Sequence, residues 1–380
     1  MEWKKLSQLV ERKICYGIVQ PGKGKNGNIP VIKVNNIISG LKSITELDTT
    51  THEIASKFQR TQLFGGEIVV SVVGSVGNTA IVPSSFKGCN LVRATAMVDI
   101  KDKVLATYVM YYFKTHEAQK YIESRLNTTV QATLNIKDLE EMPIPILQSS
   151  IILRLVSILS ALDAKIENNN KINANLEAQA QALFKSWFVD FTPFKDQPFV
   201  DSELGPIPQG WKVGTLGEFF PIVTGKKDAN ISSKSGKYPF FSCSQNISWT
   251  NDYSFDGFAI IVAGNGDFNV KWYNGKFEAY QRTYVLIPYN PTLTSWLYYA
   301  VKYNLNMITI GARGSVIKFI TKGDIQNFKV AYPQNIDKHE IVKMLGKINK
   351  DIEHNKNEVS CLAKLRDTLL PKLMSGEIKL

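Results

Sequence analysis

The chain has 380 residues, 44% of them hydrophobic and 21% charged, which is ordinary for a globular protein and enough for two or three domains. Its net charge is +11, from 45 Lys and Arg against 34 Asp and Glu. No stretch approaches the ~18 uninterrupted apolar residues of a membrane-spanning helix, and the first residues do not resemble an export signal. We therefore expect a soluble, cytoplasmic protein.

The cysteines and histidines give no support for disulfide or metal chemistry. Cys15, Cys89, Cys243 and Cys361 lie far apart and form no Cys-x-x-Cys pair. The four histidines are isolated, without the neighbouring Glu, Cys or His that a metal site or an activated nucleophile requires. We predict neither a disulfide framework nor a metal or cofactor site in this chain.

The positive charge is divided between two regions. Residues 1–147 carry 18 Lys and Arg against 13 Asp and Glu, and residues 194–333 carry 14 against 10. The segments 148–193 and 334–380 have net charges of 0 and +2. Two basic regions flanking a neutral spacer suit two modules that contact nucleic acid, although diffuse solvated lysines would give similar totals.

The first basic region is predicted to be a mixed α/β globule. Its clearest strand is the β-type run Glu67–Val73, which the glycine-rich turn Gly74–Gly77 closes. The segment Gly17–Gly24 has the spacing of a phosphate-binding loop, but its eighth residue is Gly where that loop needs a Ser or Thr hydroxyl for magnesium. A basic surface turn is the better interpretation of this segment.

A polar run, Asn127–Lys137, ends the first region before a strand-like segment. Gln and Asn amides can bond adenine bidentately, and Ser, Thr and Lys can hold phosphates, so such a loop suits a DNA groove. An ordinary polar surface loop is the alternative.

A long helix is predicted next, over about 150–187. Its heptad positions share a seven-residue spacing with one polar exception, and they are Leu155, Leu162, Asn169, Leu176 and Leu183. The Pro/Gly-rich segment 191–210 then links to the second region.

The second region is predicted to be another α/β globule, with the β-type run Phe258–Val262 and the turn Gly264–Gly266. Tyr289–Thr292 superficially resembles the motif that holds the target amino group in amino-methyltransferases, but it lacks the second proline and the aromatic residue. Gly311–Lys318 corresponds to the polar run of the first region, and its Arg could bond guanine.

The chain repeats itself at an offset of 186 residues, at which Gln148 aligns with Gln334. The first helix's heptad positions then fall on Ile341, Ile348, Asn355, Leu362 and Leu369, so a second long helix is predicted over about 336–370. Pro371 should kink or end it. If the two units are related by a pseudo-twofold axis, the helices run antiparallel, and their midpoints place Asn169 against Asn355.

The fold class is therefore mixed α/β, with two similar globules and two long, coiled-coil-like antiparallel helices. The expected boundaries are 1–147, 148–193, 194–333 and 334–380.

Three stretches carry a resemblance to a known family. Residues 180–191 (AQALFKSWFVDF) and 365–378 (LRDTLLPKLMSGEI) resemble the ends of the two conserved helices of the specificity subunit of type I restriction-modification systems. Residues 206–211 (PIPQGW) resemble the family's entry into its second target-recognition domain. The resemblance covers essentially the whole chain.

The resemblance implies a non-catalytic DNA-reading subunit of a larger complex. Each of its two recognition domains would bind one half of a bipartite double-stranded DNA target, and the helices would set the spacing and dock two methyltransferase subunits. Those partners would bring S-adenosylmethionine and methylate adenine, while restriction and translocation subunits would cut unmodified DNA. The rival hypotheses are a self-sufficient DNA methyltransferase or nuclease, and a coiled-coil adaptor that binds only proteins.

The recognition domains vary widely in this family, so no DNA contact transfers by motif. From the polar and basic clusters we take as candidate DNA-binding residues Lys23, Lys25, Ser75, Asn78, Arg93, Gln131, Thr133, Asn135, Lys226, Lys227, Asn265, Lys271, Arg282, Arg313, Ser315 and Lys318. The apolar helix stripe suggests docking of a partner through exposed Phe184, Trp187 and Phe188.

Overall fold

The computed structural model describes residues 2–22, 24–25, 27–41, 43–127, 131–233 and 235–378. The chain divides into two compact units, unit 1 with Met1–Glu167 and Ser360–Leu380, and unit 2 with Asn168–Val359. Each unit combines a globule with part of each of two long helices, α6 (Ser149–Phe188) and α10 (Glu340–Ser375). The segment boundaries that the sequence predicted after residues 147, 193 and 333 stay a prediction.

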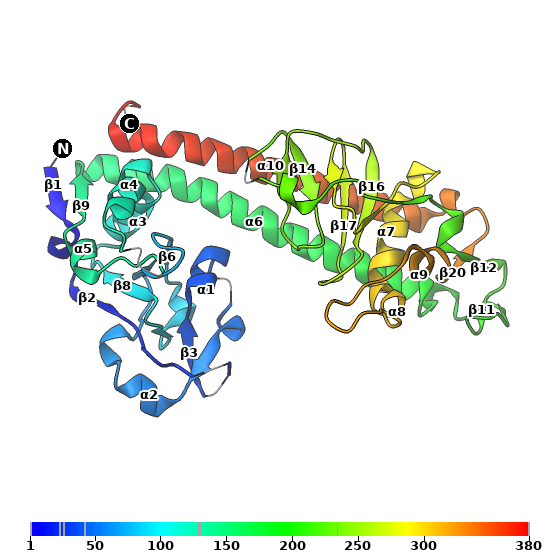
Figure 1. The fold of residues 1–380 in the computed structure, drawn as a ribbon, viewed down its shortest axis with the longest axis horizontal. Coiled ribbons are helices and arrows are strands. Elements are labelled where there is room, and N and C mark those ends of the chain that lie inside the picture. Colours follow the sequence, from blue (N-terminus) through cyan, green and yellow to red (C-terminus); the bar gives the residue numbers. More distant parts are fainter. Residues whose placement is uncertain are drawn as a thin grey trace. The chain divides into compact units, whose positions relative to one another are not determined.

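The globule of unit 1 is built on two small sheets (Figure 1). The four-stranded sheet has the order β2-β8-β5-β6, and the three-stranded sheet has the order β4-β3-β7. Its strands are β1 (Glu2–Lys5), β2 (Arg12–Tyr16), β3 (Ile29–Ile32), β4 (Asp48–Thr50), β5 (Ile68–Ser71), β6 (Thr79–Ile81), β7 (Asn90–Leu91), β8 (Thr95–Asp99) and β9 (Pro143–Ile146). Its helices are α1 (Val34–Ser39), α2 (His52–Ser56), α3 (Lys103–Phe113), α4 (His116–Ser124) and α5 (Ile136–Glu140).

The globule of unit 2 repeats this plan with sheets of order β13-β19-β16-β17 and β15-β14-β18. Its strands are β10 (Phe199–Val200), β11 (Ile207–Pro208), β12 (Trp211–Thr215), β13 (Ile222–Thr224), β14 (Tyr238–Phe241), β15 (Ser248–Thr250), β16 (Phe258–Ala263), β17 (Val270–Asn274), β18 (Glu278–Ala279), β19 (Thr283–Leu286) and β20 (Lys329–Pro333). Its helices are α7 (Thr294–Tyr303), α8 (Leu305–Ile308) and α9 (Lys322–Gln326).

The duplication predicted from the sequence is confirmed strand by strand. The predicted runs at 67–73 and 258–262 form β5 and β16, which hold the same position in the two four-stranded sheets. Each three-stranded sheet contains one parallel pair, β3 with β7 and β14 with β18. Each globule is also closed by an antiparallel ribbon, β1 with β9 and β12 with β20, whose second strand leads towards a long helix.

The core of unit 1 joins its globule to the long helices. Tyr108, Tyr111 and Phe113 of α3 are at most 2% exposed and pack in one cluster with Leu155 and Leu159 of α6. The end of α10 belongs to the same cluster through Leu370, Leu373 and Met374. Pro371, which was predicted to kink or end this helix, does not end it: α10 continues to Ser375, and burial of these side chains holds its last turn.

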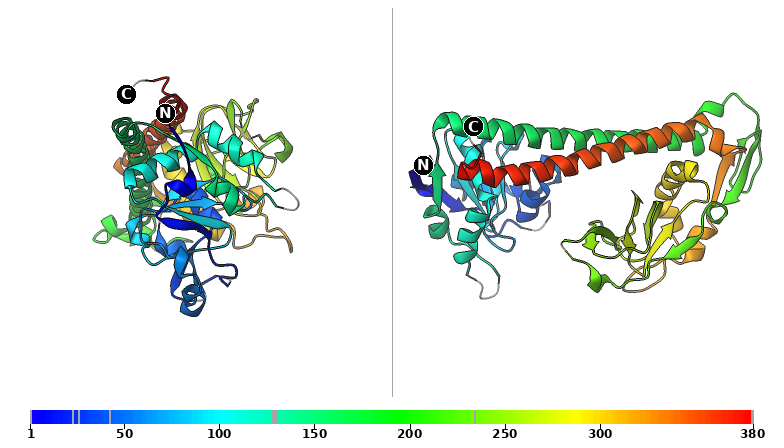
Figure 2. Two further views of the ribbon diagram at one scale, coloured as in Figure 1. Left: turned by 90° about the vertical axis from the view of Figure 1, so that its left-hand side faces the viewer. Right: turned by 90° about the horizontal axis from the view of Figure 1, so that it is seen from above.

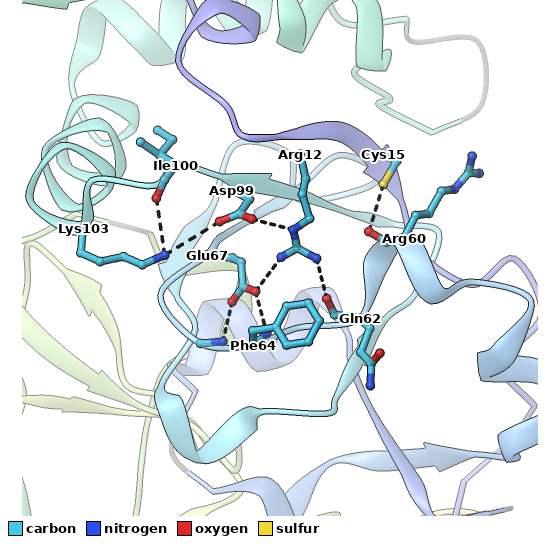
Figure 3. A network of polar contacts seen from close by, with 10 residues as sticks. Arg12, Cys15, Arg60, Gln62, Phe64, Glu67, Asp99, Ile100 and Lys103 are labelled. Atoms are coloured by element: carbon cyan, nitrogen blue, oxygen red, sulfur yellow. Dashed lines mark hydrogen bonds and ion pairs between the residues drawn. The ribbon is translucent and has the colours of Figure 1, made fainter.

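An ionic network links β2, β8 and the start of β5 in the four-stranded sheet of unit 1 (Figure 3). The Arg12 guanidinium on β2 donates to Asp99 on β8 at 2.5 Å and to Glu67, just before β5, at 2.7 Å. Glu67 is 1% exposed and also accepts the backbone N–H groups of Phe64 and Gly65 at 2.6 and 2.7 Å. The charge of Glu67 is therefore fully compensated, as a buried carboxylate requires.

Phe184, Trp187 and Phe188 of α6 were predicted to be exposed docking residues, and their predicted exposure was wrong. Phe184 and Phe188 are 3% and 7% exposed and lie in the core of unit 2. The Phe188 ring packs against those of Trp211 and Trp296, and the partly buried Trp187 contacts Phe194 and His339. The apolar stripe at the end of α6 is covered by the chain's own globule, which the helical pattern alone did not indicate.

Helix α6 begins and ends within one residue of the predicted positions, whereas α10 begins four residues and ends five residues later than predicted. Predicted to start near residue 336, α10 begins at Glu340, because Asn335 has a left-handed φ of 55° and Ile336–Lys338 form a 3-10 turn. None of the helices in the described ranges is long and apolar enough to cross a membrane.

The helices are antiparallel in unit 2, where they lie side by side (Figure 2), but Asn169 does not meet Asn355 as predicted. Asn355 donates to Asn173 at 2.9 Å, and Asn169 donates to Glu358 at 2.7 Å. The pairing is shifted by about one helical turn. The shift follows from the bounds of α10, 340–375 rather than 336–370, which move its centre towards the C-terminus.

Candidate nucleic-acid interface

A polar hollow of about 520 Å³ opens on the globule of unit 1. Four chain segments line it: the end of β2 with the residues after it, the turn before β8, the segment 131–135 and Val73 after β5. Four of the residues predicted to bind DNA share this hollow, and Arg93 is distant in sequence from the other three, which are Gln131, Thr133 and Asn135.

Backbone hydrogen bonds fix the first two segments side by side. The Ile18 N–H donates to Leu91 O and the Arg93 N–H donates to Ile18 O, both at 2.7 Å. Gly17 permits this approach, because a Cβ there would lie 2.1 Å from Leu91 O. Arg93 is thereby presented from a fixed turn, and its side chain is exposed.

The third segment is held by backbone hydrogen bonds to Asn127 and Val72. Asn127 and Thr133 exchange two backbone hydrogen bonds of 3.0 and 3.1 Å, and the Leu134 N–H donates to Val72 O at 2.9 Å. Leu134 is fully buried, so its neighbours in an extended segment project the other way. This alternation turns Thr133 and Asn135 towards the hollow, where Gln131 joins them.

The polar groups in the hollow differ in how far they are already engaged. Thr133 Oγ1 donates to Gln131 O at 3.1 Å, and Asn135 Nδ2 donates to Asp138 Oδ2 at 3.3 Å. Within the described ranges, no side-chain hydrogen bond or ion pair is recorded for Arg93 or for the Gln131 amide. Arg93 and Gln131 are thus the donors and acceptors best placed to engage a ligand.

The other candidates of unit 1 lie outside this lining. The turn between β5 and β6 exposes Ser75, whose carbonyl accepts the Asn78 side-chain amide at 2.8 Å, so Asn78 holds the turn. Lys25 Nζ donates to Thr45 O at 3.0 Å. Lys23 lies outside the described residues.

The surface formed by the segments that line the hollow is called the edge of the unit. Unit 2 has a corresponding edge, built by the same kind of backbone hydrogen bonds. The Gln281 N–H donates to Lys227 O at 2.9 Å, and the Gly264 N–H donates to Arg282 O at 2.9 Å. Arg282 thus lies on the turn before β19, as Arg93 lies on the turn before β8, and their predicted similar placement is confirmed.

The base of a hairpin in unit 2 matches the Asn127–Thr133 pairing of unit 1 at an offset of 186 residues. Arg313 and Phe319 exchange backbone bonds of 2.9 and 2.8 Å, as Asn127 and Thr133 do. Asn265 forms an isolated antiparallel β-bridge with the same Phe319. The edge therefore brings together Lys226, Lys227, Asn265, Arg282, Arg313, Ser315 and Lys318.

Arg313 of this edge and Lys271, a further candidate of unit 2, already have protein partners. The Arg313 guanidinium pairs with Asp324 at 2.9 Å, so its fork already has a carboxylate partner. Burial raises the pKa of Asp324, but bonds from Thr321 and from Arg313 outweigh it and lower the pKa overall. Lys271 Nζ donates to Ser244 O at 2.7 Å, and burial lowers its pKa.

Exposed apolar side chains were missed by the sequence reasoning. Val316 and Ile317 occupy the tip of the unit 2 hairpin, between Ser315 and Lys318, and are 93% and 58% exposed. The signal in the sequence was an apolar pair inside a polar, glycine-containing run, which is unusual for a plain surface loop.

Comparison with known proteins places these features in a family. A family model described as the type I restriction modification DNA specificity domain matches residues 1–178 and 208–359. The type I restriction enzyme EcoDI specificity subunit of Escherichia coli is 39% identical over 178 residues, which are 46% of this chain and 40% of that protein. The MjaIX specificity subunit of Methanocaldococcus jannaschii is 27% identical over 306 residues, which are 73% of this chain and 70% of that protein.

A solved structure shares the fold over nearly the whole chain. The crystal structure of a type I restriction-modification system S subunit from M. genitalium superposes with a TM-score of 0.58 at 18% identity. The match covers 98% of this chain and 95% of that one. It supports the assignment of two α/β domains with two long helices.

Proposed function

Since the chain belongs to the family of type I restriction-modification DNA specificity proteins, we propose that each of its two units reads one half of a bipartite DNA target. The family is the non-catalytic specificity subunit of such complexes. The observation that supports two half-sites is the duplicated edge, at which the same backbone bonds gather Arg93 and Gln131 in unit 1 and Arg282 in unit 2.

The chemistry of the edge supports sequence reading rather than charge attraction alone. Arg and Gln side chains can make paired hydrogen bonds to the base edges in the major groove, whereas lysines mainly hold phosphates. Both kinds of side chain are exposed at the edge of unit 2, with Lys226 and Lys318 beside Arg282. Duplex DNA is thus the partner whose charge and hydrogen-bonding groups this edge complements.

The decisive experiment exchanges one recognition domain for that of a relative and maps methylation in host DNA. If each domain reads separately, replacing residues 1–147 changes one half of the methylated sequence and preserves the other. A hybrid that altered both halves, or a host that showed no methylation dependent on the gene, would contradict the proposal.

The long helices are proposed to set the spacing between the half-sites and to dock two methyltransferase subunits. Apolar side chains remain exposed on α6 and α10 where the globules do not cover them, namely Leu153, Ile158, Ile172, Met344 and Leu365. Such side chains on a long helix suit contact with a partner. Ile158→Ser with Leu365→Ser should lower assembly with the methyltransferase subunits, while Phe184→Ser should lower folding first.

If the helices set the spacing, their length should determine the distance between the two DNA half-sites. At 1.5 Å per residue, deleting one heptad from each helix shortens the pair by about 10 Å, or about three base pairs. If the variant assembles, methylation mapping should show a shorter gap between the same two half-sites. Retention of the original gap would show that helix length does not set the distance between the half-sites.

The chemistry is proposed to belong to the partners. Methyltransferase subunits would supply S-adenosylmethionine and methylate adenine, and restriction subunits would join through the complex. A complex of this kind acts on chromosomal DNA, which is in the cytoplasm. The purified chain should neither bind S-adenosylmethionine nor modify DNA by itself, and saturable cofactor binding by the chain alone would favour the rival enzyme hypothesis.

A further inference from the structure

An apolar tip projects from the DNA-reading edge of unit 2. The tip of the hairpin 313–319 is the loop Gly314-Ser315-Val316-Ile317-Lys318. In this loop Val316 and Ile317 are 93% and 58% exposed. Exposing two adjacent aliphatic side chains to water costs free energy without benefit to the fold, since neither packs in a described core cluster. Such side chains indicate a surface that is covered by a partner.

The tip is held in one shape from its base. Arg313 and Phe319 close the hairpin with two backbone bonds, and the Gly266 N–H donates to Lys318 O at 2.9 Å. Gly314 has a φ of 100°, and a Cβ there would lie 2.2 Å from Ile317 O, so only glycine allows this turn. The ion pair of Arg313 with Asp324 braces the base from α9. The apolar tip is therefore presented in advance of binding.

The surroundings of the tip favour nucleic acid over protein as the partner. Lys318 belongs to the tip itself, and the neighbouring segments present exposed Lys226 and Arg282. The nearby carboxylate of Asp324 is already paired with Arg313. An apolar tip within a basic surface requires an anionic partner that also offers an apolar group, and duplex DNA offers the 5-methyl group of thymine at the major-groove edge.

We propose that Val316 and Ile317 read thymine by contact with its 5-methyl group, in the half-site bound by unit 2. Lys318 and Ser315 flank the contact and hold adjacent phosphates. This inference rests on the proposed function, because it requires that unit 2 bind a defined half-site. It adds a discrimination by shape and apolarity to the hydrogen-bonding readout of the neighbouring polar side chains.

The test uses the full chain assembled with its methyltransferase subunits and a duplex carrying the target found by methylation mapping. Each thymine of the target is replaced in turn by uracil, which removes only the methyl group. Loss of one buried methyl should weaken binding about fourfold, from roughly 0.8 kcal/mol per buried carbon. The loss should occur at one or two thymines of the unit 2 half-site.

A double-substitution cycle then assigns the contact. In the Val316→Ala or Ile317→Ala complex, binding to the thymine duplex should fall about threefold to tenfold, and the uracil duplex should be bound no more weakly than the thymine duplex. Tyr289→Ala is a matched control, because Tyr289 is 69% exposed but lies beyond the opposite end of β19. The control should keep the full sensitivity to uracil.

The outcomes separate this inference from the proposed function. If the complex binds its target specifically but no uracil substitution is coupled to Val316 or Ile317, the inference fails and the proposed function stands. If both tip variants bind DNA normally but recover fewer methyltransferase subunits, the tip is a protein-docking surface and the inference is overturned. If the complex prefers no duplex sequence, both are overturned.

Discussion

Asn355 of α10 donates its side-chain amide to Asn173 Oδ1 of α6 at 2.9 Å, in the seam between the long helices in unit 2. Asn173 is 9% exposed, and its own Nδ2 is buried without a partner among the described residues. One turn away, Asn169 donates to the Glu358 carboxylate. Polar bonds that form at only one alignment make a helix pair select its register at some cost in stability.

Replacing both members of the asparagine pair should therefore stabilise unit 2. Asn173→Leu with Asn355→Leu removes one buried and one half-buried amide and their incomplete hydrogen bonding, and should leave the free energy of unfolding unchanged or higher by about 1 kcal/mol. Asn355→Leu alone leaves the buried Asn173 side chain without its hydrogen-bond donor and should lower the free energy of unfolding by about 1–3 kcal/mol. Urea unfolding of the full chain measures both. A double variant less stable than the single one would contradict this account of the seam.

Removing Arg12 should destabilise unit 1 severely. Arg12→Ala leaves the carboxylate of Glu67 buried without its guanidinium partner, which should cost about 3–5 kcal/mol of unfolding free energy. Lys57→Ala is the matched control, because it breaks only the exposed ion pair with Glu53 and should cost less than about 0.5 kcal/mol. Chemical denaturation compares the two, and equal losses would show that the network of Figure 3 contributes little.

Gln131→Ala should reduce discrimination more than affinity for DNA in general. If the exposed amide in the unit 1 hollow reads a base, its loss weakens binding to the target by about 1–3 kcal/mol and leaves binding to random duplex nearly unchanged. Gln59→Ala, an exposed glutamine that does not line this hollow, is the control. Competition binding of the assembled complex measures both, and equal losses on both duplexes would reassign Gln131 to a phosphate contact.

Acidification should weaken unit 2 through His339. Burial lowers the pKa of His339 although Glu340 raises it, and Nδ1 has no partner among the described residues. Because the folded pKa is below the unfolded value of about 6.5, the unfolded state binds more protons, and stability falls as the pH drops below about 7. His339→Gln should flatten this pH dependence in unfolding measured between about pH 5 and 8. Parallel curves would exclude His339 as the source.

Some of the recognition edge was accessible from the sequence and some was not. Gln131, Thr133, Asn135 and Arg93 could be proposed from residue chemistry, because amide, hydroxyl and guanidinium groups are those that bind nucleic acid. That they share one hollow depends on hydrogen bonds between Ile18 and Arg93 and between Leu134 and Val72, which join segments over 60 residues apart. Local sequence carries no record of such pairings.

The sequence by itself determined the duplication, because two copies with one seven-residue pattern at a constant offset must form two similar units with two long helices. Only the tertiary structure decided which face of each helix is covered and at what alignment. Phe184 and Phe188 lie in the core of unit 2 and Asn355 meets Asn173, because the globule folds back over α6 and Asn335 delays the start of α10. A heptad pattern records that a face is apolar, whereas the element that covers it is set by contacts distant in the chain.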